Sequence, residues 1–231
     1  MMKKLLVLLP LLFNLSFAQL SFDRTRVIFD HSISRSQSIV VSNTSKSAPY
    51  LAQSWIENEQ GQKLTGPLTA LPILQRVNPG EEQQIRIDFS GASALPKDRE
   101  SLLYLQVRGG PPKGEENKVS ITIQSRLKIF YRPQGLTKYD DKKLYEELKV
   151  TKNGNSLTLE NPTPYHMVIY GFKSQRSSKL IDKDIILKPF STQNVSVKVG
   201  NTPLIYFIND QGGTNAVSYQ CSSTCSGQLS R

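Results

Sequence analysis

Histidine, cysteine and catalytic sequence motifs are all scarce in this sequence. The 231 residues include two histidines and two cysteines. The chain has no Gly-x-Ser-x-Gly elbow, no His-Glu-x-x-His pair and no phosphate-binding P-loop. Few side chains can therefore exchange protons near neutral pH, and we expect His31 and His166 to be surface or strand residues. The sequence argues against an enzyme and predicts no nucleotide, metal or other cofactor.

Long hydrophobic runs are also missing after the first 18 residues. Those residues combine a basic start, the apolar stretch 5–13 and small residues at 16–18. This pattern is typical of a cleaved secretory signal peptide, and it is too short to span a membrane. We therefore expect export from the cytoplasm, with residues 1–18 removed. The rest is long enough for two domains of about 100 residues each.

The chain has many more basic than acidic residues. The formal net charge is +10, and removing Lys3 and Lys4 still leaves a basic surplus. The basic residues are scattered along the chain, and an exported protein rarely meets nucleic acid, so we expect no nucleic-acid partner. A surplus of this kind instead favours partners that carry carboxylates or net negative charge.

Cys221 and Cys225 lie close together near the end of the chain. In an oxidising compartment such a pair is expected to form a local disulfide bond. The alternative is a pair of metal ligands, but neither histidine lies near them in the sequence. A bond that closes so small a loop staples a hairpin or a tail and does not hold two domains together.

Short stretches that alternate apolar and polar residues dominate the rest. They occur at 38–43, 51–55, 85–89, 103–107, 117–133, 157–159, 167–172, 195–199 and 204–208, with turn residues between them. No segment of 12 or more residues has a clean helical period. The pattern predicts an all-β sandwich or barrel fold. A break at 134–142 predicts two domains, residues 19–137 and 138–231, although a single larger β domain is an alternative.

The stretch Asn-Lys-Val-Ser-Ile-Thr-Ile-Gln-Ser-Arg-Leu-Lys-Ile-Phe-Tyr-Arg-Pro, residues 117–133, is the most unusual. Val119, Ile121 and Ile123 alternate with polar residues, and Lys128 follows in the second half. The pattern alone favours a row that faces the core. If the row were exposed, it would invite pairing with another chain.

Six motifs in order give the sequence a resemblance. They are SFDRTRVIFD (21–30), PYLAQSWIENE (49–59), DRESLLYL (98–105), KIFYRP (128–133), LENPTPY (159–165) and FINDQGG (207–213). The chain resembles the periplasmic pilus chaperones of the chaperone–usher pathway over nearly its whole exported length. The short segment 108–118 before the 117–133 strand resembles the short-loop subclass of that family.

The resemblance implies two immunoglobulin-like β-sandwich domains set at an angle, with a cleft between them. It also implies donor-strand complementation, in which the chaperone lends a strand to fill the groove of an incomplete pilus subunit. The groove-filling residues would be Val119, Ile121 and Ile123. The carboxylate at the subunit's C-terminus would be anchored by Arg26 and Lys128. Glu100, Arg132 and Asp210 would form an interdomain charge network.

The implied partners are pilus subunits, including an adhesin, and an outer-membrane usher. The free chain could also pair with itself through its aliphatic row. The implied function is a periplasmic chaperone that caps and folds subunits and delivers them for pilus assembly. The alternative is a secreted immunoglobulin-like structural or adhesive pilus subunit, although such subunits are shorter than this chain.

The position of Lys128 in the 117–133 strand raises one difficulty. Lys128 has opposite parity to Val119, Ile121 and Ile123, so in a regular strand it points to the other face. A bulge, a twist of the strand, or a cleft that lies on the other face would each resolve this.

Overall fold

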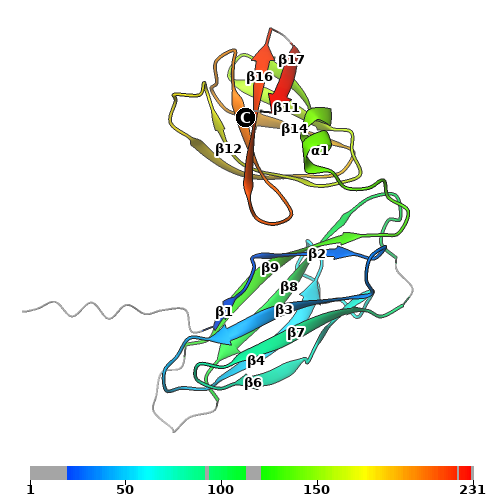
Figure 1. The fold of residues 1–231 in the computed structure, drawn as a ribbon, viewed down its shortest axis with the longest axis vertical. Coiled ribbons are helices and arrows are strands. Elements are labelled where there is room, and N and C mark those ends of the chain that lie inside the picture. Colours follow the sequence, from blue (N-terminus) through cyan, green and yellow to red (C-terminus); the bar gives the residue numbers. More distant parts are fainter. Residues whose placement is uncertain (1–19, 92–93, 113–120, 223, 230–231) are drawn as a thin grey trace, which may run out of the picture.

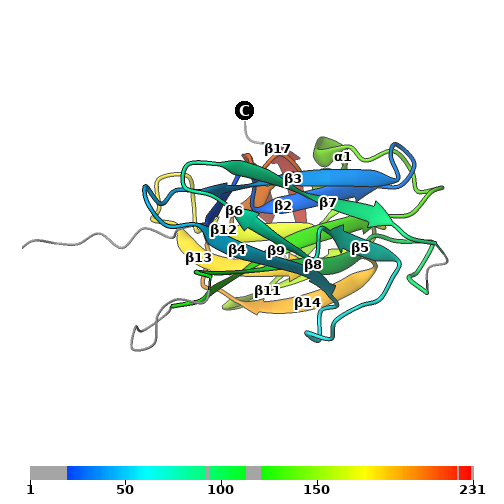
Figure 2. The ribbon, with the colours of Figure 1, turned by 90° about the horizontal axis from the view of Figure 1, so that it is seen from below.

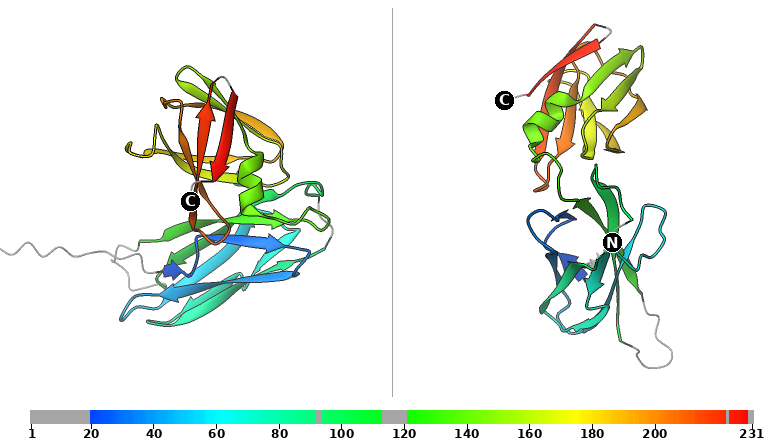
Figure 3. Two further views of the ribbon diagram at one scale, coloured as in Figure 1. Left: turned by 45° about the horizontal axis from the view of Figure 1, so that its top comes forward. Right: turned by 90° about the vertical axis from the view of Figure 1, so that its right-hand side faces the viewer.

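The computed structural model describes residues 20–91, 94–112, 121–222 and 224–229, and within them the chain forms two β lobes (Figure 1). The N-terminal lobe contains β1 to β9 and the C-terminal lobe contains α1 and β10 to β17. The prediction of an all-β protein with two β domains is confirmed. The segment that follows β9 joins the lobes and leads into α1, as both views in Figure 3 show.

The N-terminal lobe is a sandwich of two sheets. Its strands are β1 (Leu20–Phe22), β2 (Arg26–Asp30), β3 (Ser36–Asn43), β4 (Tyr50–Glu57), β5 (Leu68–Leu71), β6 (Leu74–Val77), β7 (Glu82–Phe89), β8 (Ser101–Gly110) and β9 (Ile123–Arg132). One sheet has the order β1-β3-β7-β5 and the other the order β2-β9-β8-β4-β6. Figure 2 shows the molecule from below, with the strands of this lobe running across the view in front of the C-terminal lobe.

Alternating residues of both sheets fill the core of this lobe. Phe29, Ile39, Ile85, Leu105 and Ile129 are all fully buried and belong to one cluster. They come from five strands, and in each strand the flanking residues are less buried or face the other side. The period-2 pattern in the sequence therefore marks which face of each strand is buried.

In the described residues, the C-terminal lobe contains one helix and eight strands. They are α1 (Asp141–Glu147), β10 (Lys149–Asn153), β11 (Ser156–Asn161), β12 (Met167–Lys173), β13 (Ile181–Leu187), β14 (Ser191–Ser196), β15 (Leu204–Ile208), β16 (Thr214–Cys221) and β17 (Thr224–Leu229). The strand order is β13-β12-β15-β16-β17-β10-β11-β14, and the sheet folds around a second core. Cys221 and Cys225 are partners in the β16–β17 hairpin and form a disulfide bond.

Helix α1 was not predicted from the sequence. It has seven residues, too few for a helical period to emerge among charged neighbours. The Asp140 side chain accepts hydrogen bonds from the backbone N–H groups of Lys142 and Lys143 and so caps the helix. Leu144 and Tyr145 are buried against the second core. In the described part of the chain, no helix is long and apolar enough to cross a membrane.

Candidate functional site

Arg26 and Lys128 lie side by side where the two lobes meet. Strand β2 pairs with β9 in parallel, and Arg26 is the register partner of Lys128. Both side chains are half-buried. Lys128 has no hydrogen-bond or ion-pair partner among the described residues. One Arg26 nitrogen, Nη1, donates to the carbonyl oxygen of Asn209 in the C-terminal lobe at 3.3 Å, while its Nε is buried without a partner.

Two effects compete on the Arg26 guanidinium. Burial lowers its pKa, and the nearby carboxylate of Asp210 opposes that change. A guanidinium keeps its charge in proteins under either influence. The pair therefore offers two positive charges with spare donors in a partly dehydrated place, an arrangement suited to a carboxylate.

The parity of Lys128 is explained by the position of the second lobe. Strand β9 runs in unbroken antiparallel register with β8, from Ile123 opposite Gly109 to Tyr131 opposite Ser101, so it contains no bulge. The odd-numbered residues 127, 129 and 131 enter the core of the N-terminal lobe. The even-numbered Phe130 and Arg132 contact the C-terminal lobe, and Lys128 shares their face. The cleft is therefore on the other face of a regular strand.

The aliphatic row does not face the core where the structure describes it. Ile121 is 73% exposed and Ile123 is 47% exposed, and Val119 lies outside the described residues. Ile123 has the parity of Leu127, which is only 6% exposed. Ile123 therefore continues the buried face of β9 past the end of the core, and the interpretation from pattern alone, that the row faces the core, is wrong for Ile121 and Ile123.

One edge of β9 is open beside this row. Strand β2 pairs only with residues 128 to 132 of β9, whereas β8 pairs with the strand from residue 123 onward. Among the described residues, no strand pairs with the second edge of β9 between Ile123 and Leu127. Unpaired N–H and C=O groups along such an edge can accept a strand from another chain.

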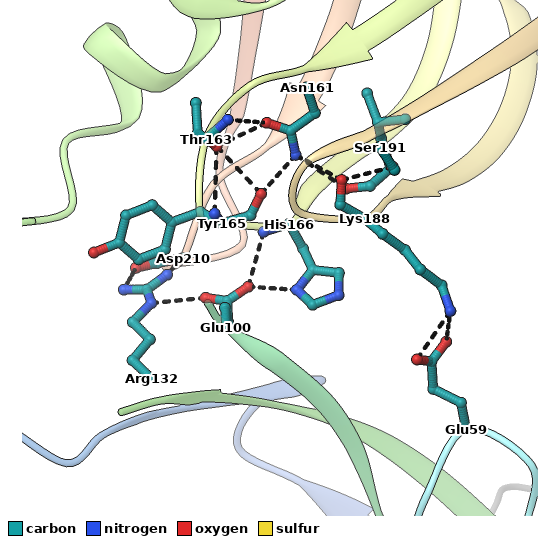
Figure 4. A network of polar contacts seen from close by, with 11 residues as sticks. Glu59, Glu100, Arg132, Asn161, Thr163, Tyr165, His166, Lys188, Ser191 and Asp210 are labelled. Carbon is teal, nitrogen blue, oxygen red and sulfur yellow. Dashed lines mark hydrogen bonds and ion pairs between the residues drawn. The ribbon is translucent and has the colours of Figure 1, made fainter. Parts of the chain in front are cut away.

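Arg132 joins the lobes through a buried network (Figure 4). Its Nε donates to Glu100 Oε2 at 2.7 Å, and its Nη1 and Nη2 donate to the two carboxylate oxygens of Asp210 at 2.7 and 2.9 Å. Glu100 lies directly before β8 in the N-terminal lobe, and Asp210 lies in the β15–β16 turn of the other lobe. Tyr139 and Tyr165 stack on the guanidinium.

The electrostatics of this network favour the charged guanidinium. Burial alone would lower the pKa of Arg132, but the hydrogen bonds and charges of Asp210 and Glu100 outweigh burial and raise it. Buried, bidentate pairs of this kind are far more costly to break than surface pairs. The network therefore restrains the relative orientation of the two lobes.

His166 belongs to the same network, and the expectation that it is a surface or strand residue was wrong. It is 8% exposed and lies in the loop before β12. Its backbone N–H donates to Glu100 Oε1 at 3.0 Å, and its ring Nδ1 lies 2.7 Å from the same oxygen. The sequence held one signal: His166 directly follows the LENPTPY motif. Histidine scarcity alone did not show which histidine was buried.

Apolar side chains also hold the lobes together. Leu102 and Phe130 of the N-terminal lobe pack against Val168 of the C-terminal lobe, and partly buried residues of both lobes surround them. Phe130 and Val168 of this cluster also line the small pocket between the lobes, beside Arg26 and Arg132. No group of His, Cys, Asp or Glu residues suited to a metal ion occurs in the part of the chain that the structure describes.

Two family models match the chain. The pili and flagellar-assembly chaperone PapD N-terminal domain matches residues 19–137, and the pili assembly chaperone PapD C-terminal domain matches residues 143–219. The chaperone protein PapD of Escherichia coli is 38% identical over 232 residues, 97% of each chain. The chaperone protein PmfD of Proteus mirabilis is 36% identical, covering 91% of this chain and 86% of its own.

Solved structures agree with this result. The periplasmic chaperone SfaE is 30% identical, with a TM-score of 0.71, over 86% of this chain and 98% of its own. A chain from the complex of the Salmonella enterica SafA pilin with the SafB chaperone is 25% identical, with a TM-score of 0.75, over 87% of this chain and 96% of its own. The chain therefore belongs to the PapD family of pilus assembly chaperones, and its two β domains are the immunoglobulin-like domains of that family.

Proposed function

We propose that this chain is a periplasmic chaperone that captures pilus subunits by lending them the first part of β9 together with the residues that lead into it. The observation that carries the proposal is the continuity of one strand. Exposed isoleucines and an open edge at its start lead directly to two cations in the cleft. Membership of the PapD family favours this function over the alternative of a structural or adhesive pilus subunit.

Val119, Ile121 and Ile123 are proposed to fill the hydrophobic groove of the subunit. Full burial of one such side chain stabilises a complex by about 1.5–3 kcal/mol. Main-chain hydrogen bonds along the open edge would satisfy the subunit's own unpaired strand. The association is therefore expected to be driven mainly by burial, offset by the cost of ordering both partners.

Arg26 and Lys128 are proposed to bind the carboxylate at the subunit's C-terminus. Two observations support this role: the ammonium of Lys128 has no partner among the described residues, and within the same part of the chain the buried Nε of Arg26 has none either. An anchored carboxylate would also set the register of the added strand, because a slip of one residue turns every isoleucine out of the groove.

Residues 1–18 are proposed to direct export to the periplasm, where the chain would deliver subunits to an outer-membrane usher. No nucleotide is required by this scheme, because the final folding of the subunit can supply the free energy of release. The free chain is also proposed to pair with itself through the open edge of β9. Sedimentation that detects only monomer at high concentration would contradict this last point.

The test is a periplasmic pull-down with three tagged proteins: wild type, Lys128→Ala and Ile121→Asp. Co-purifying proteins are identified by mass. We expect small exported pilus subunits with wild type, and few or none with either variant. Equal recovery with Lys128→Ala would contradict the proposed carboxylate anchor but not the proposed donation of the strand. If wild type captures nothing from cells that express pilus subunits, the proposed function is wrong.

A further inference from the structure

The first part of β9 receives little support from neighbouring strands. Strand β2 pairs with β9 only from Lys128 onward, so residues 123–127 lie beside β8 alone among the described strands. Ile123 is the register partner of Gly109, which has no side chain to pack against it. A strand end with one neighbour and an exposed apolar side chain is expected to fray. The side chains on its other face are therefore the ones that can hold it extended.

A closed ring of side chains joins β9 to β8 and β4 on the face that carries Lys128. Its members are Trp55 and Glu57 on β4, Gln106 and Arg108 on β8, and Gln124 on β9. The three strands are neighbours in one sheet, as Figure 1 shows. The register places Gln124 opposite Arg108, and it places Gln106 opposite Trp55. Residues from three strands thus meet over the sheet.

Hydrogen bonds make every link of this ring except one. Gln124 Nε2 donates to Gln106 Oε1 at 3.1 Å, and Gln106 Nε2 donates to Glu57 Oε2 at 2.6 Å. The other carboxylate oxygen of Glu57 accepts a bond from Trp55 Nε1 at 2.6 Å. Arg108 closes the ring, because its Nε and Nη2 donate to Gln124 Oε1 at 3.2 and 3.1 Å, and its guanidinium carbon lies 5.2 Å from the centre of the Trp55 ring. Both ends of the Gln124 amide are therefore bonded.

Gln106 is the central member of the ring. It is 3% exposed, although it is polar and lies on the outer face of the sheet. One end of its amide serves β9 and the other serves β4. A buried amide is costly unless both of its ends are paired, so the ring is stable as a whole. Because so little of Gln106 is accessible, its effect on a binding partner has to pass through its neighbours.

Arg126, the next residue of β9 on this face, is held in the same direction. Its guanidinium carbon lies 3.5 Å from the centre of the Tyr104 ring on β8. Its Nη2 donates to the carbonyl oxygen of Glu59, just after β4, at 3.4 Å. The side chains of Gln124 and Arg126 are thus both drawn across β8 toward β4. That is the side of β9 opposite the open edge, so these two side chains leave the edge clear.

We infer that Gln106 is a positioning residue, which through the ring holds the first part of β9 extended before any partner binds. The role rests on the proposed function, in which this part of β9 is lent to a pilus subunit. A strand that is already ordered avoids part of the entropy cost that binding would otherwise carry. The exposed isoleucine and the open edge are then presented together, in the conformation that an added strand requires.

The test is amide hydrogen exchange of the full exported chain, measured by NMR without any ligand. Gln106→Met keeps the length of the side chain and cuts the ring on both sides of Gln106. We expect the protected amides of residues 123–127 to exchange about fivefold faster than in wild type, as the loss of one hydrogen bond predicts. Amides of residues 128–132, which have paired strands on both sides, should keep the wild-type rates.

Two further variants make the test specific. Gln124→Met removes the β9 member of the ring and leaves the bond between Gln106 and Glu57 in place, so it should give the same local rise in exchange. Gln53→Met is the matched control. Gln53 is exposed on the same face of the sheet, opposite Arg108, and takes no part in the ring. Its replacement should leave the exchange of residues 123–127 as it is in wild type.

Two results of the exchange measurement would overturn the inference. One is unchanged exchange of residues 123–127 in both Gln106→Met and Gln124→Met. The other is a rise spread evenly over the N-terminal lobe, because Gln106 would then only support the sandwich. Circular dichroism checks that each variant folds. If Gln106→Met does not fold, Gln124→Met decides, since Gln124 is exposed and its replacement removes nothing from the core.

The periplasmic pull-down tests the consequence for capture. At equal amounts of folded, tagged protein, Gln106→Met should recover less pilus subunit than Gln53→Met. Equal recovery by the two variants, with faster exchange in Gln106→Met, would overturn the positioning role and leave the proposed function intact. If wild type captures no subunit, the proposed function fails instead, and the exchange measurement still decides whether the ring orders β9.

Discussion

Arg26 and Lys128 are register partners in two parallel strands, so that both side chains lie on the face of the N-terminal lobe that meets the C-terminal lobe. They lie 102 positions apart in the sequence, which is most of the length of the N-terminal domain. Only the pairing of β2 with β9 makes them neighbours.

Replacing Lys128 with alanine should abolish stable subunit complexes without lowering the melting temperature. The side chain is half-buried and bonds no other described residue, so the fold loses little. A charge-assisted contact contributes about 1.5–3 kcal/mol, equivalent to a loss of roughly 10- to 100-fold in affinity. Titration calorimetry with the captured subunit measures this. Lys142→Ala, which removes an exposed lysine from α1, is the control and should bind normally.

Replacing Ile123 with aspartate should weaken capture and spare the fold. Ile123 is 47% exposed, whereas Leu127, on the same face of β9, is 6% exposed. Loss of one groove contact should cost about 1.5–3 kcal/mol of binding free energy. The matched control is Leu127→Asp, which puts a charge into the core and should lower the melting temperature sharply. Similar melting curves for the two variants would show that the isoleucine is a core residue after all.

Replacing Arg132 with methionine should destabilise the chain by about 3–5 kcal/mol, because it removes the guanidinium from the buried carboxylate of Glu100 and the bidentate partner from Asp210. Denaturant unfolding measures the loss. The contrasting change is Glu147→Gln, which breaks an exposed pair with Lys143 at 3.9 Å and should alter stability by less than about 1 kcal/mol. Equal effects would mean that the interdomain network contributes no more than a surface pair.

Replacing both Cys221 and Cys225 with serine should cost about 2 kcal/mol of stability, the amount expected for closing a very small loop. Subunit capture should be unchanged, because the bond staples the β16–β17 hairpin and no residue of the cleft lies on it. Unfolding of wild type with and without a reductant gives the same comparison. A reduced protein that no longer binds subunits would contradict this assignment.

The sequence was enough to predict the strands whose alternation marks a buried face, such as β3, β7 and β8. The resemblance of its motifs to those of the pilus chaperones singled out Glu100, Arg132 and Asp210, whose contact is seen in the structure. The sequence could not show on which face of β9 the cleft lies. The parity of Lys128 can be interpreted only when the position of the second lobe is known. Helix α1 was missed since seven residues are held by a cap and tertiary packing, not by a period.

The burial of His166 is a second feature that the sequence could not predict. Its burial depends on Asn161, which folds the preceding loop, and on Glu100, which lies 66 positions earlier. A residue whose partners are distant in sequence carries no local pattern. The same is true of the open edge of β9, because an unpaired edge is defined by which strands stop short of it.

Because the register of β9 is unbroken, the distance between two of its residues is fixed. Lys128 lies five positions after Ile123, and a regular strand covers that interval in about 17 Å. A subunit held at both points must therefore place its hydrophobic groove at that fixed distance from its own last carboxylate. Adding or removing two residues at the end of a subunit preserves its chemistry and the orientation of its side chains but changes the length. Under the proposed function, such a subunit would reach one of the two points and miss the other, so the length of its last segment would decide whether it is captured.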